Sequence, residues 1–108
     1  MSTLSTHVLD SALGRPASDV GVRLESATRV EIAVGRTDAD GRIGDLVPEG
    51  LAAGSYWLFF DTAGYFASTG QEAFYPEVII AFTIADPAEH YHVPLLLAPF
   101  AYSTYRGS

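Results

Sequence analysis

Apolar and polar residues alternate along much of this chain, and this period of two restricts its fold more than any other feature. The alternation occurs over residues 4–9, 20–25 and 30–35. One set in each segment is mainly apolar: Leu4, Thr6 and Val8; Val20, Val22 and Leu24; and Val30, Ile32 and Val34. Because successive side chains of a strand point to opposite faces of a sheet, the pattern predicts half-buried strands with one apolar face.

Two further segments, 55–62 and 78–85, are apolar on both faces. Strands of this kind are covered on two sides, either by an opposing sheet or by another subunit, and the second case predicts an oligomer. Turn-forming residues separate the segments at 14–19, 38–41, 48–54 and 85–89. Short strands at this spacing predict an all-β sandwich or small barrel, with a short helix within residues 61–74.

Length and charge limit the kind of protein and its partners. A chain of 108 residues is expected to fold as a single domain over residues 1–108. Thirteen acidic residues against six basic ones give a net charge of −7, which argues against nucleic acid or an anionic membrane and favours a small-molecule partner. The sequence contains no secretion signal and no apolar stretch that is long enough for a membrane span, so we expect a cytoplasmic protein.

Lysine and cysteine are absent, which excludes several kinds of catalytic chemistry. All six basic residues are arginines, so there is no lysine for a Schiff base or for activating a serine. Without cysteine there are no disulfides, thiol nucleophiles or thiolate metal ligands. The chain also lacks a G-x-S-x-G elbow, a phosphate loop and a dinucleotide fingerprint. Any cationic site must therefore use the planar guanidinium group.

The segment 90–98 places histidines on a strand surface. His90 and His92 lie opposite the apolar face of this segment, which contains Tyr91, Val93, Leu95 and Leu97. By the same count His7 lies opposite the apolar face of residues 4–9, so histidines of the two strands would meet if the strands were neighbours. Pro94 lies within the run although proline is usually confined to edge strands and bulges, and we expect a ladder irregularity there.

Structural roles compete with catalytic ones at each of these positions. A histidine on a strand surface is more often solvated or singly hydrogen-bonded than catalytic. His90 and His92 point the same way and could bind a metal, but a third ligand is missing. Arg42 could be a solvated turn residue, and Arg106 and Ser108 a frayed tail. The residues alone thus predict an acidic β-sandwich with a candidate site of histidine and arginine.

Five segments together resemble the transthyretin-like 5-hydroxyisourate hydrolases, in order and over essentially the whole chain. They are LSTHVLDSALGRPA, TDADGRI, GSYWLFFDTAGYF, FYPEV and HYHVPLLLAPFAYSTYRGS. The terminal Tyr-Arg-Gly-Ser, residues 105–108, is the most specific of them. It distinguishes the enzymes from the hormone-carrying transthyretins of similar fold.

The resemblance implies an all-β fold, a transthyretin-like sandwich of two four-stranded sheets with one short helix after the fifth strand. It also implies a homotetramer with a channel between dimers and an active site at each end of the channel. The first, seventh and eighth strands would lie side by side. That order places Pro94 inside a sheet and makes the strands of His7 and His92 neighbours.

The resemblance further implies a reaction and a set of site residues. The reaction is hydrolysis of 5-hydroxyisourate, the product of urate oxidation, to 2-oxo-4-hydroxy-4-carboxy-5-ureidoimidazoline, with neither metal nor cofactor. An imidazole suits removal of a proton from water, and a guanidinium suits the oxyanion that forms. The expected catalytic residues are His7, Arg42, His92 and Ser108, and the expected substrate-binding residues are His7, Arg42, Tyr105, Arg106 and Gly107.

Two details of the site and two other functions stay open at this level. Either His7 or His92 could be the general base, and Gly107 is expected to let the backbone approach the ligand closely. A transthyretin-like carrier would use the same channel without turnover, but it would not need paired imidazoles beside Arg42. A structural β-sandwich module would pair through its edge strands.

Overall fold

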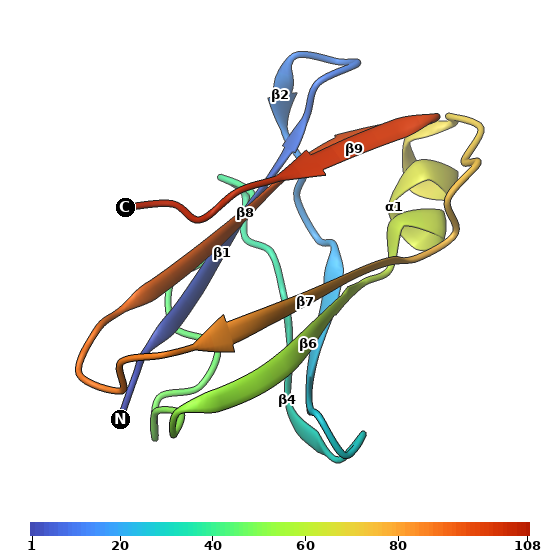
Figure 1. Ribbon diagram of the computed structural model, residues 1–108. Helices are drawn as coiled ribbons and strands as arrows, with labels where there is room; N and C mark the ends of the chain where they lie inside the picture. Colours follow the sequence, from blue (N-terminus) through green and yellow to red (C-terminus); the bar gives the residue numbers. More distant parts are fainter.

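The alternating segments form two β-sheets that pack face to face in the computed structural model, which describes residues 1–108 (Figure 1). One sheet consists of β1 (Leu4–Asp10), β2 (Arg15–Pro16), β5 (Arg42–Ile43), β8 (Tyr91–Ala98) and β9 (Ala101–Thr104). The other consists of β3 (Gly21–Ser26), β4 (Glu31–Arg36), β6 (Gly54–Phe60) and β7 (Val78–Ile84), in the order β4-β3-β6-β7. The predicted all-β sandwich is therefore confirmed.

The first sheet has five strands where four were expected. Its two shortest strands, β2 and β5, both pair with β1, at Leu9–Asp10 and at Thr6–His7 respectively. They follow one another along the same edge, because the other edge of β1 is paired with β8. The sheet is thus at most four strands wide. The first, seventh and eighth strands were expected to lie side by side. They are β1, β8 and β9 here, because the additional strand β2 raises the number of each later strand by one.

The core lies between the sheets and contains the alternating residues that were predicted to face it. Leu4 and Val8 of β1 and Leu95 of β8 are fully buried, as are Leu24 and Leu58 of the opposing sheet. Burying a side chain of this size contributes roughly 1.5–3 kcal/mol relative to leaving it exposed. The face of β1 and β8 that carries histidines therefore points away from the core.

The apolar face of β4 points outward, contrary to the prediction for residues 30–35. Val30 and Val34 are 60% and 65% exposed, and the half-buried Ala33 packs against the core instead. The register explains this orientation, because Ala33 lies opposite the fully buried Leu24 of β3. A period of two shows which residues share a face, but not which face points inward.

The two strands with apolar residues on both faces differ in how their outer faces are covered. On β6 the outer side chain Phe59 is buried beneath Arg23, whose guanidinium carbon lies 4.1 Å from the ring centroid. On β7 the outer residue Ile79 is 50% exposed. Within the single chain, arginine covers the outer face of β6 at Phe59, and the outer face of β7 is left uncovered at Ile79. The expected covering by a second subunit stays a prediction.

The predicted helix is α1 (Thr62–Thr69), at one end of the sandwich (Figure 1). The Asp61 side chain caps its first turn by accepting from the Gly64 N–H, and Gly70 ends it with a left-handed φ of 71°. No helix of this structure is both long and apolar enough to cross a membrane.

A buried carboxylate joins α1 to the first sheet. Asp10 accepts hydrogen bonds from the Tyr65 hydroxyl at 2.7 Å, the Gln71 amide at 3.1 Å and the backbone N–H of Leu13 at 2.8 Å. Burial alone would raise the pKa of Asp10, but these hydrogen bonds outweigh it and lower that pKa. Burial and the bond to Asp10 raise the pKa of Tyr65 to about 12.

Pro94 interrupts the ladder on one side of β8 only, which confirms the expected irregularity. The parallel pairing of β8 with β1 runs without a break through His7 and Pro94. On the β9 side, regular pairing stops at Leu95 and resumes as a single bridge between His92 and Gly107. Proline has no N–H to donate there, and its carbonyl oxygen accepts from the Thr104 hydroxyl at 2.7 Å.

Candidate active site

Three strands of the first sheet bring His7, Arg42 and His92 together on the face away from the core. In the parallel pairing of β1 with β8, Ser5 lies opposite His92. In the antiparallel pairing of β1 with β5, His7 lies opposite Arg42. The predicted proximity of the two histidine-bearing strands is therefore confirmed, and Arg42 joins them from the other edge of β1.

His92 is held in an environment that keeps its imidazole neutral. The ring is half-buried, and its Nδ1 lies 2.7 Å from the Ser5 hydroxyl. Burial, followed by the positive charge of Arg42 and the neighbouring His7 and His90, lowers the pKa of His92 below the 6.5 that is ordinary for a histidine. Nε2 makes no hydrogen bond within the chain, so it is the ring nitrogen that can act on a ligand.

The turn before β5 positions both His7 and Arg42. The Asp38 carboxylate accepts from the backbone N–H groups of Asp40 and Arg42, each at 2.9 Å. His7 Nε2 lies 2.8 Å from the carbonyl oxygen of Asp40, and since a carbonyl only accepts, Nε2 carries the proton. Gly41 has a φ of 75°, and a Cβ there would lie 2.4 Å from the Val8 carbonyl oxygen, so the turn requires glycine.

Arg42 and His92 line one cavity of about 260 Å³. Ser108 lines it as well, and the remaining lining residues are Ser5, Thr6, Ile43, Gly44 and His90. The Arg42 guanidinium makes no ion pair or hydrogen bond with another side chain of the chain. A guanidinium without a partner, close to a neutral imidazole, can bind an anion or polarise a carbonyl group.

The C-terminal residues reach this cavity because Gly107 packs against His92. The Gly107 N–H donates to the His92 carbonyl oxygen at 2.9 Å. A Cβ at Gly107 would lie 2.4 Å from Cδ2 of the His92 ring. Glycine is therefore required for close approach to His92, whereas the sequence led us to expect close approach to the ligand. The contact between Gly107 and His92 places Ser108 at the wall of the cavity.

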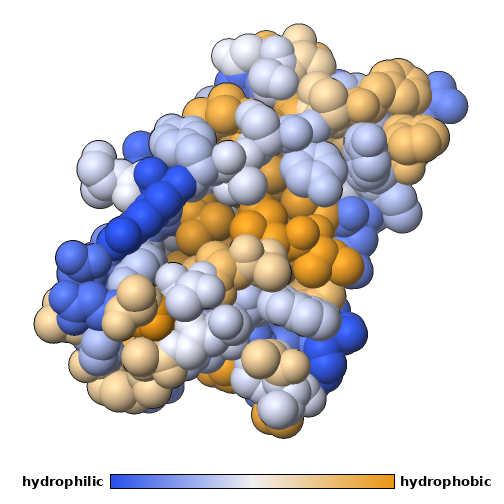
Figure 2. Space-filling view, in the orientation of Figure 1, coloured by the Kyte–Doolittle hydropathy of each residue, from blue (hydrophilic) through white to orange (hydrophobic).

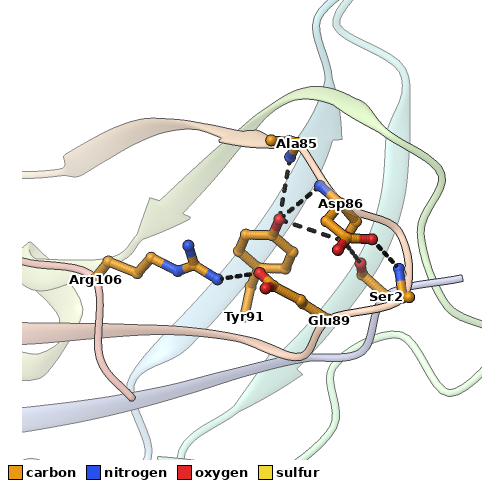
Figure 3. A network of polar contacts seen from close by, with 7 residues as sticks. Ser2, Ala85, Asp86, Glu89, Tyr91 and Arg106 are labelled. Atoms are coloured by element: carbon orange, nitrogen blue, oxygen red, sulfur yellow. Dashed lines mark hydrogen bonds and ion pairs between the residues drawn. The ribbon is translucent and has the colours of Figure 1, made fainter.

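Tyr105 and Arg106 face a different cavity within the single chain. This second cavity, of about 310 Å³, lies between the sheets, and His92 lines it too. The Arg106 guanidinium lies 2.7 Å from the Glu89 carboxylate and 4.4 Å from the centroid of the Tyr91 ring (Figure 3). The Tyr91 hydroxyl accepts from backbone N–H groups of the β7–β8 loop. Arg106 thereby ties the tail to that loop.

Sequence reasoning missed Ser5 and left His90 without a role. The Ser5 hydroxyl lies 2.8 Å from Nε2 of His90 as well as 2.7 Å from Nδ1 of His92. Ser5 is two residues before His7 and therefore lies on the same face of the strand. This spacing is the one feature of the sequence that places Ser5 near the candidate site. Its partner on β8 depends on the register, which the sequence does not specify. No group of three or more His, Cys, Asp or Glu side chains is arranged to hold a metal ion.

The chain is similar to known proteins along its whole length. A family model described as HIUase/Transthyretin family matches residues 4–107. A 5-hydroxyisourate hydrolase of Mus musculus is 46% identical, and the match covers 99% of this chain and 96% of that protein. A 5-hydroxyisourate hydrolase of Caulobacter vibrioides is 44% identical, with both chains covered completely.

Two solved structures show the same fold with different functions. The 5-hydroxyisourate hydrolase of Klebsiella pneumoniae superimposes with a TM-score of 0.91 at 42% identity, covering 100% of this chain and 94% of that chain. A sea bream transthyretin in complex with thyroxine superimposes with a TM-score of 0.88 at 33% identity, covering 96% and 93%. The fold therefore accommodates both an enzyme and a carrier.

Proposed function

The chain belongs to the HIUase/transthyretin family, and we propose that within this family it is a 5-hydroxyisourate hydrolase of urate degradation. Relatives of that name are 42–48% identical over nearly the whole chain, whereas the sea bream transthyretin is 33% identical. The observation that carries the proposal is the cavity shared by a neutral imidazole, His92, and an unpartnered guanidinium, Arg42. A carrier that binds its ligand without turnover needs neither.

His92 is the general base of the proposed reaction. Its lowered pKa leaves the imidazole unprotonated near neutral pH, and Nδ1 is occupied by Ser5 while Nε2 is free. Nε2 removes a proton from water, and the water oxygen adds to a ring carbonyl carbon of the substrate. The leaving ring nitrogen then takes the proton back from Nε2 as the carbon–nitrogen bond breaks. The ring opens to a carboxylate.

Arg42 stabilises the oxyanion that forms when water adds. Its planar guanidinium donates two parallel hydrogen bonds, and no carboxylate within the chain competes for them. His7 donates from Nε2 to Asp40, which leaves Nδ1 to accept a hydrogen bond from the substrate. The Ser108 hydroxyl and terminal carboxylate orient the attacking water. Tyr105, Arg106 and Gly107 remain proposed substrate-binding residues on the strength of the family resemblance alone.

A homotetramer is the proposed assembly. Figure 2 shows apolar side chains in the opening between the two sheets, and the cavity there is lined by Ile80, Phe82 and Val93 among others. The edges beside this opening belong to β7 and β9, which each pair with only one strand of the chain. Pairing with further copies would cover both the edges and the opening.

The test of the proposed activity is the decay of 5-hydroxyisourate prepared by fresh enzymatic oxidation of urate, followed by ultraviolet absorbance. We expect the protein to accelerate this decay with or without a chelator. A decay that matches the protein-free control, obtained with folded protein, would contradict the proposal. Binding of the intermediate without faster decay would favour a carrier.

A further inference from the structure

A chain of hydrogen bonds leads from His92 to the exposed His90 through the hydroxyl of Ser5. Nδ1 of His92 lies 2.7 Å from the Ser5 oxygen, and Nε2 of His90 lies 2.8 Å from the same oxygen. On the far side of His90, Nδ1 contacts the Thr3 hydroxyl at 2.5 Å. Ser5 and His92 are paired near the start of β1 and β8, and Thr3 and His90 directly precede these two strands, so the parallel pairing brings all four groups side by side.

Ser5 has one hydroxyl proton and can donate to only one of the two rings, which gives two arrangements of this chain when both histidines are neutral and Ser5 donates within it. In the first, His92 donates from Nδ1 to Ser5, Ser5 donates to His90 Nε2, and His90 donates from Nδ1 to Thr3. In the second, every donor and acceptor is reversed. The first places a lone pair on Nε2 of His92, and the second places a proton there. Arg42 lines the same cavity, and its positive charge favours a lone pair toward it.

We propose that Ser5 and His90 form a proton relay that presents His92 with a lone pair on Nε2 and removes its second proton during water attack. The relay rests on the proposed hydrolase function. Ser5 and His90 are positioning and relay residues, because they act on the substrate only through His92. Neither residue was assigned a part in the reaction on family resemblance.

The relay balances each proton of the reaction. When water attacks, its proton moves to Nε2 of His92, the Nδ1 proton of His92 moves to Ser5, and the Ser5 proton moves to Nε2 of His90. His90 becomes an imidazolium and the tetrahedral intermediate carries the negative charge. When the carbon–nitrogen bond breaks, the leaving nitrogen takes the proton from Nε2 of His92. The other two protons then return along the chain, which restores the starting state.

The relay places the positive charge where solvation is better. His92 is half-buried and faces Arg42, His7 and His90, so a cation on its ring is disfavoured by burial and by like charge. His90 is exposed and forms no ion pair with a carboxylate. Its polar contacts are Thr3 and Ser5. Transfer from His92 to His90 therefore moves the charge from the wall of the cavity to solvent.

Replacement of Ser5 tests the relay directly. Ser5→Ala removes both contacts of the hydroxyl, and we expect kcat to fall about ten- to a hundredfold with KM changed less than about twofold. Ser5→Thr keeps a hydroxyl and should retain most of the activity. Ser55→Ala, at an exposed position of β6 in the other sheet, is the matched control. Equal kcat values for Ser5→Ala and Ser55→Ala would overturn the proposal.

His90→Gln separates proton transfer from positioning. A glutamine amide can hold a hydrogen bond to Ser5, but it cannot accept a proton. The relay predicts a loss in kcat for this variant of about tenfold or more, without a change in the tautomer of His92. A His90→Gln protein with the kcat of the parent would limit Ser5 to positioning and would contradict the relay.

Nitrogen NMR of the imidazole rings gives a readout that needs no substrate. In the parent at a pH where His92 is neutral, we expect the proton on Nδ1 and none on Nε2, and we expect this preference to weaken in Ser5→Ala. A proton on Nε2 of His92 in the parent would overturn the proposal even if the protein is an active hydrolase. If the parent fails to hydrolyse 5-hydroxyisourate, the hydrolase proposal fails, while the tautomer of His92 still decides the arrangement of the chain.

Discussion

The three histidines of this chain differ in what their neighbours allow them to do. His7 donates to a backbone carbonyl, which assigns its proton to Nε2. His90 is exposed between two hydroxyl groups. His92 is half-buried, lines the same cavity as Arg42 and has a ring nitrogen, Nε2, without a partner. The chemistry of the site thus depends on environments that the residue type alone does not reveal.

The lowered pKa of His92 predicts the pH dependence of the hydrolase. The reaction needs the neutral imidazole, so kcat/KM is expected to fall with decreasing pH through an apparent pKa below 6.5. Arg42→Met removes a positive charge that disfavours the imidazolium, so its acid limb should move to higher pH. Rate profiles of parent and variant between pH 4 and 8 test this expectation. An unchanged acid limb in Arg42→Met would show that the charge of Arg42 does not lower the pKa of His92.

Arg42→Lys tests the geometry of the cation separately from its charge. An ammonium cannot reproduce the two parallel donors of a guanidinium, so kcat should fall on the order of a hundredfold. Because the charge is kept, the acid limb of the pH profile should stay in place. Arg36→Lys, which changes an exposed arginine paired with Asp19, is the matched control. Equal rates for the two variants would reduce Arg42 to general attraction of the substrate.

At the scale of elements, the junction of β1 with α1 depends on the Asp10 carboxylate. Its pKa is lower in the folded than in the unfolded chain, so its contribution to stability is present at neutral pH and is lost as the pH falls below about 3.8. Asp10→Asn should lower the free energy of unfolding at neutral pH by about 1–3 kcal/mol, because it leaves buried donors without an acceptor.

Denaturant unfolding of the Asp10 variant at several pH values provides the measurement. The difference between parent and Asp10→Asn should shrink as the pH decreases toward 3. Asp45→Asn, at an exposed position without a hydrogen bond, is the control and should match the parent throughout. A constant difference across this pH range would show that the ionised form of Asp10 is not the stabilising one.

The tail after β9 is an element of the site rather than of the core. Its residues 105–108 are exposed or half-buried, and its ion pair between Arg106 and Glu89 is exposed on both sides. Such pairs contribute about 0–1 kcal/mol. Deleting residues 106–108 should therefore leave the melting temperature within a few degrees of the parent, while turnover falls severely because Ser108 and the contact of Gly107 with His92 are lost.

Thermal melting and the urate-coupled assay on one truncated sample test this expectation together. Unchanged turnover would return the terminal residues to the status of an inert tail. A large drop in melting temperature would make the tail a structural element, and its effect on turnover would then be indirect.

At the scale of the whole molecule, the single chain leaves apolar surface uncovered. Ile79 on β7 is 50% exposed, Phe100 just before β9 is 63% exposed, and Tyr102 in β9 is 41% exposed. The proposed homotetramer would bury such residues, and we expect light scattering to give about four times the 11.6 kDa of one chain. A monomer with full hydrolase activity would contradict both the tetramer and a site shared between subunits.

Much of the fold and part of the site follow from the order of residues along the chain. The period of two places His7 and His92 away from the core, and α1 and the irregularity at Pro94 lie where they were predicted. These features depend on local chemistry: alternation of side chains in a strand, capping of a helix and the missing N–H of proline. The roles of the site residues and the cytoplasmic location remain predictions.

Only the tertiary structure decided how these local features meet. The pairing of Ser5 with His92, the inward face of β4 and the direction of Arg106 all depend on partners far away in the sequence. An alternating strand can present either face to the core, and it can pair with its neighbour in several registers. Both choices are made by packing across the sandwich, because a shift of one residue would move every buried side chain to the opposite face.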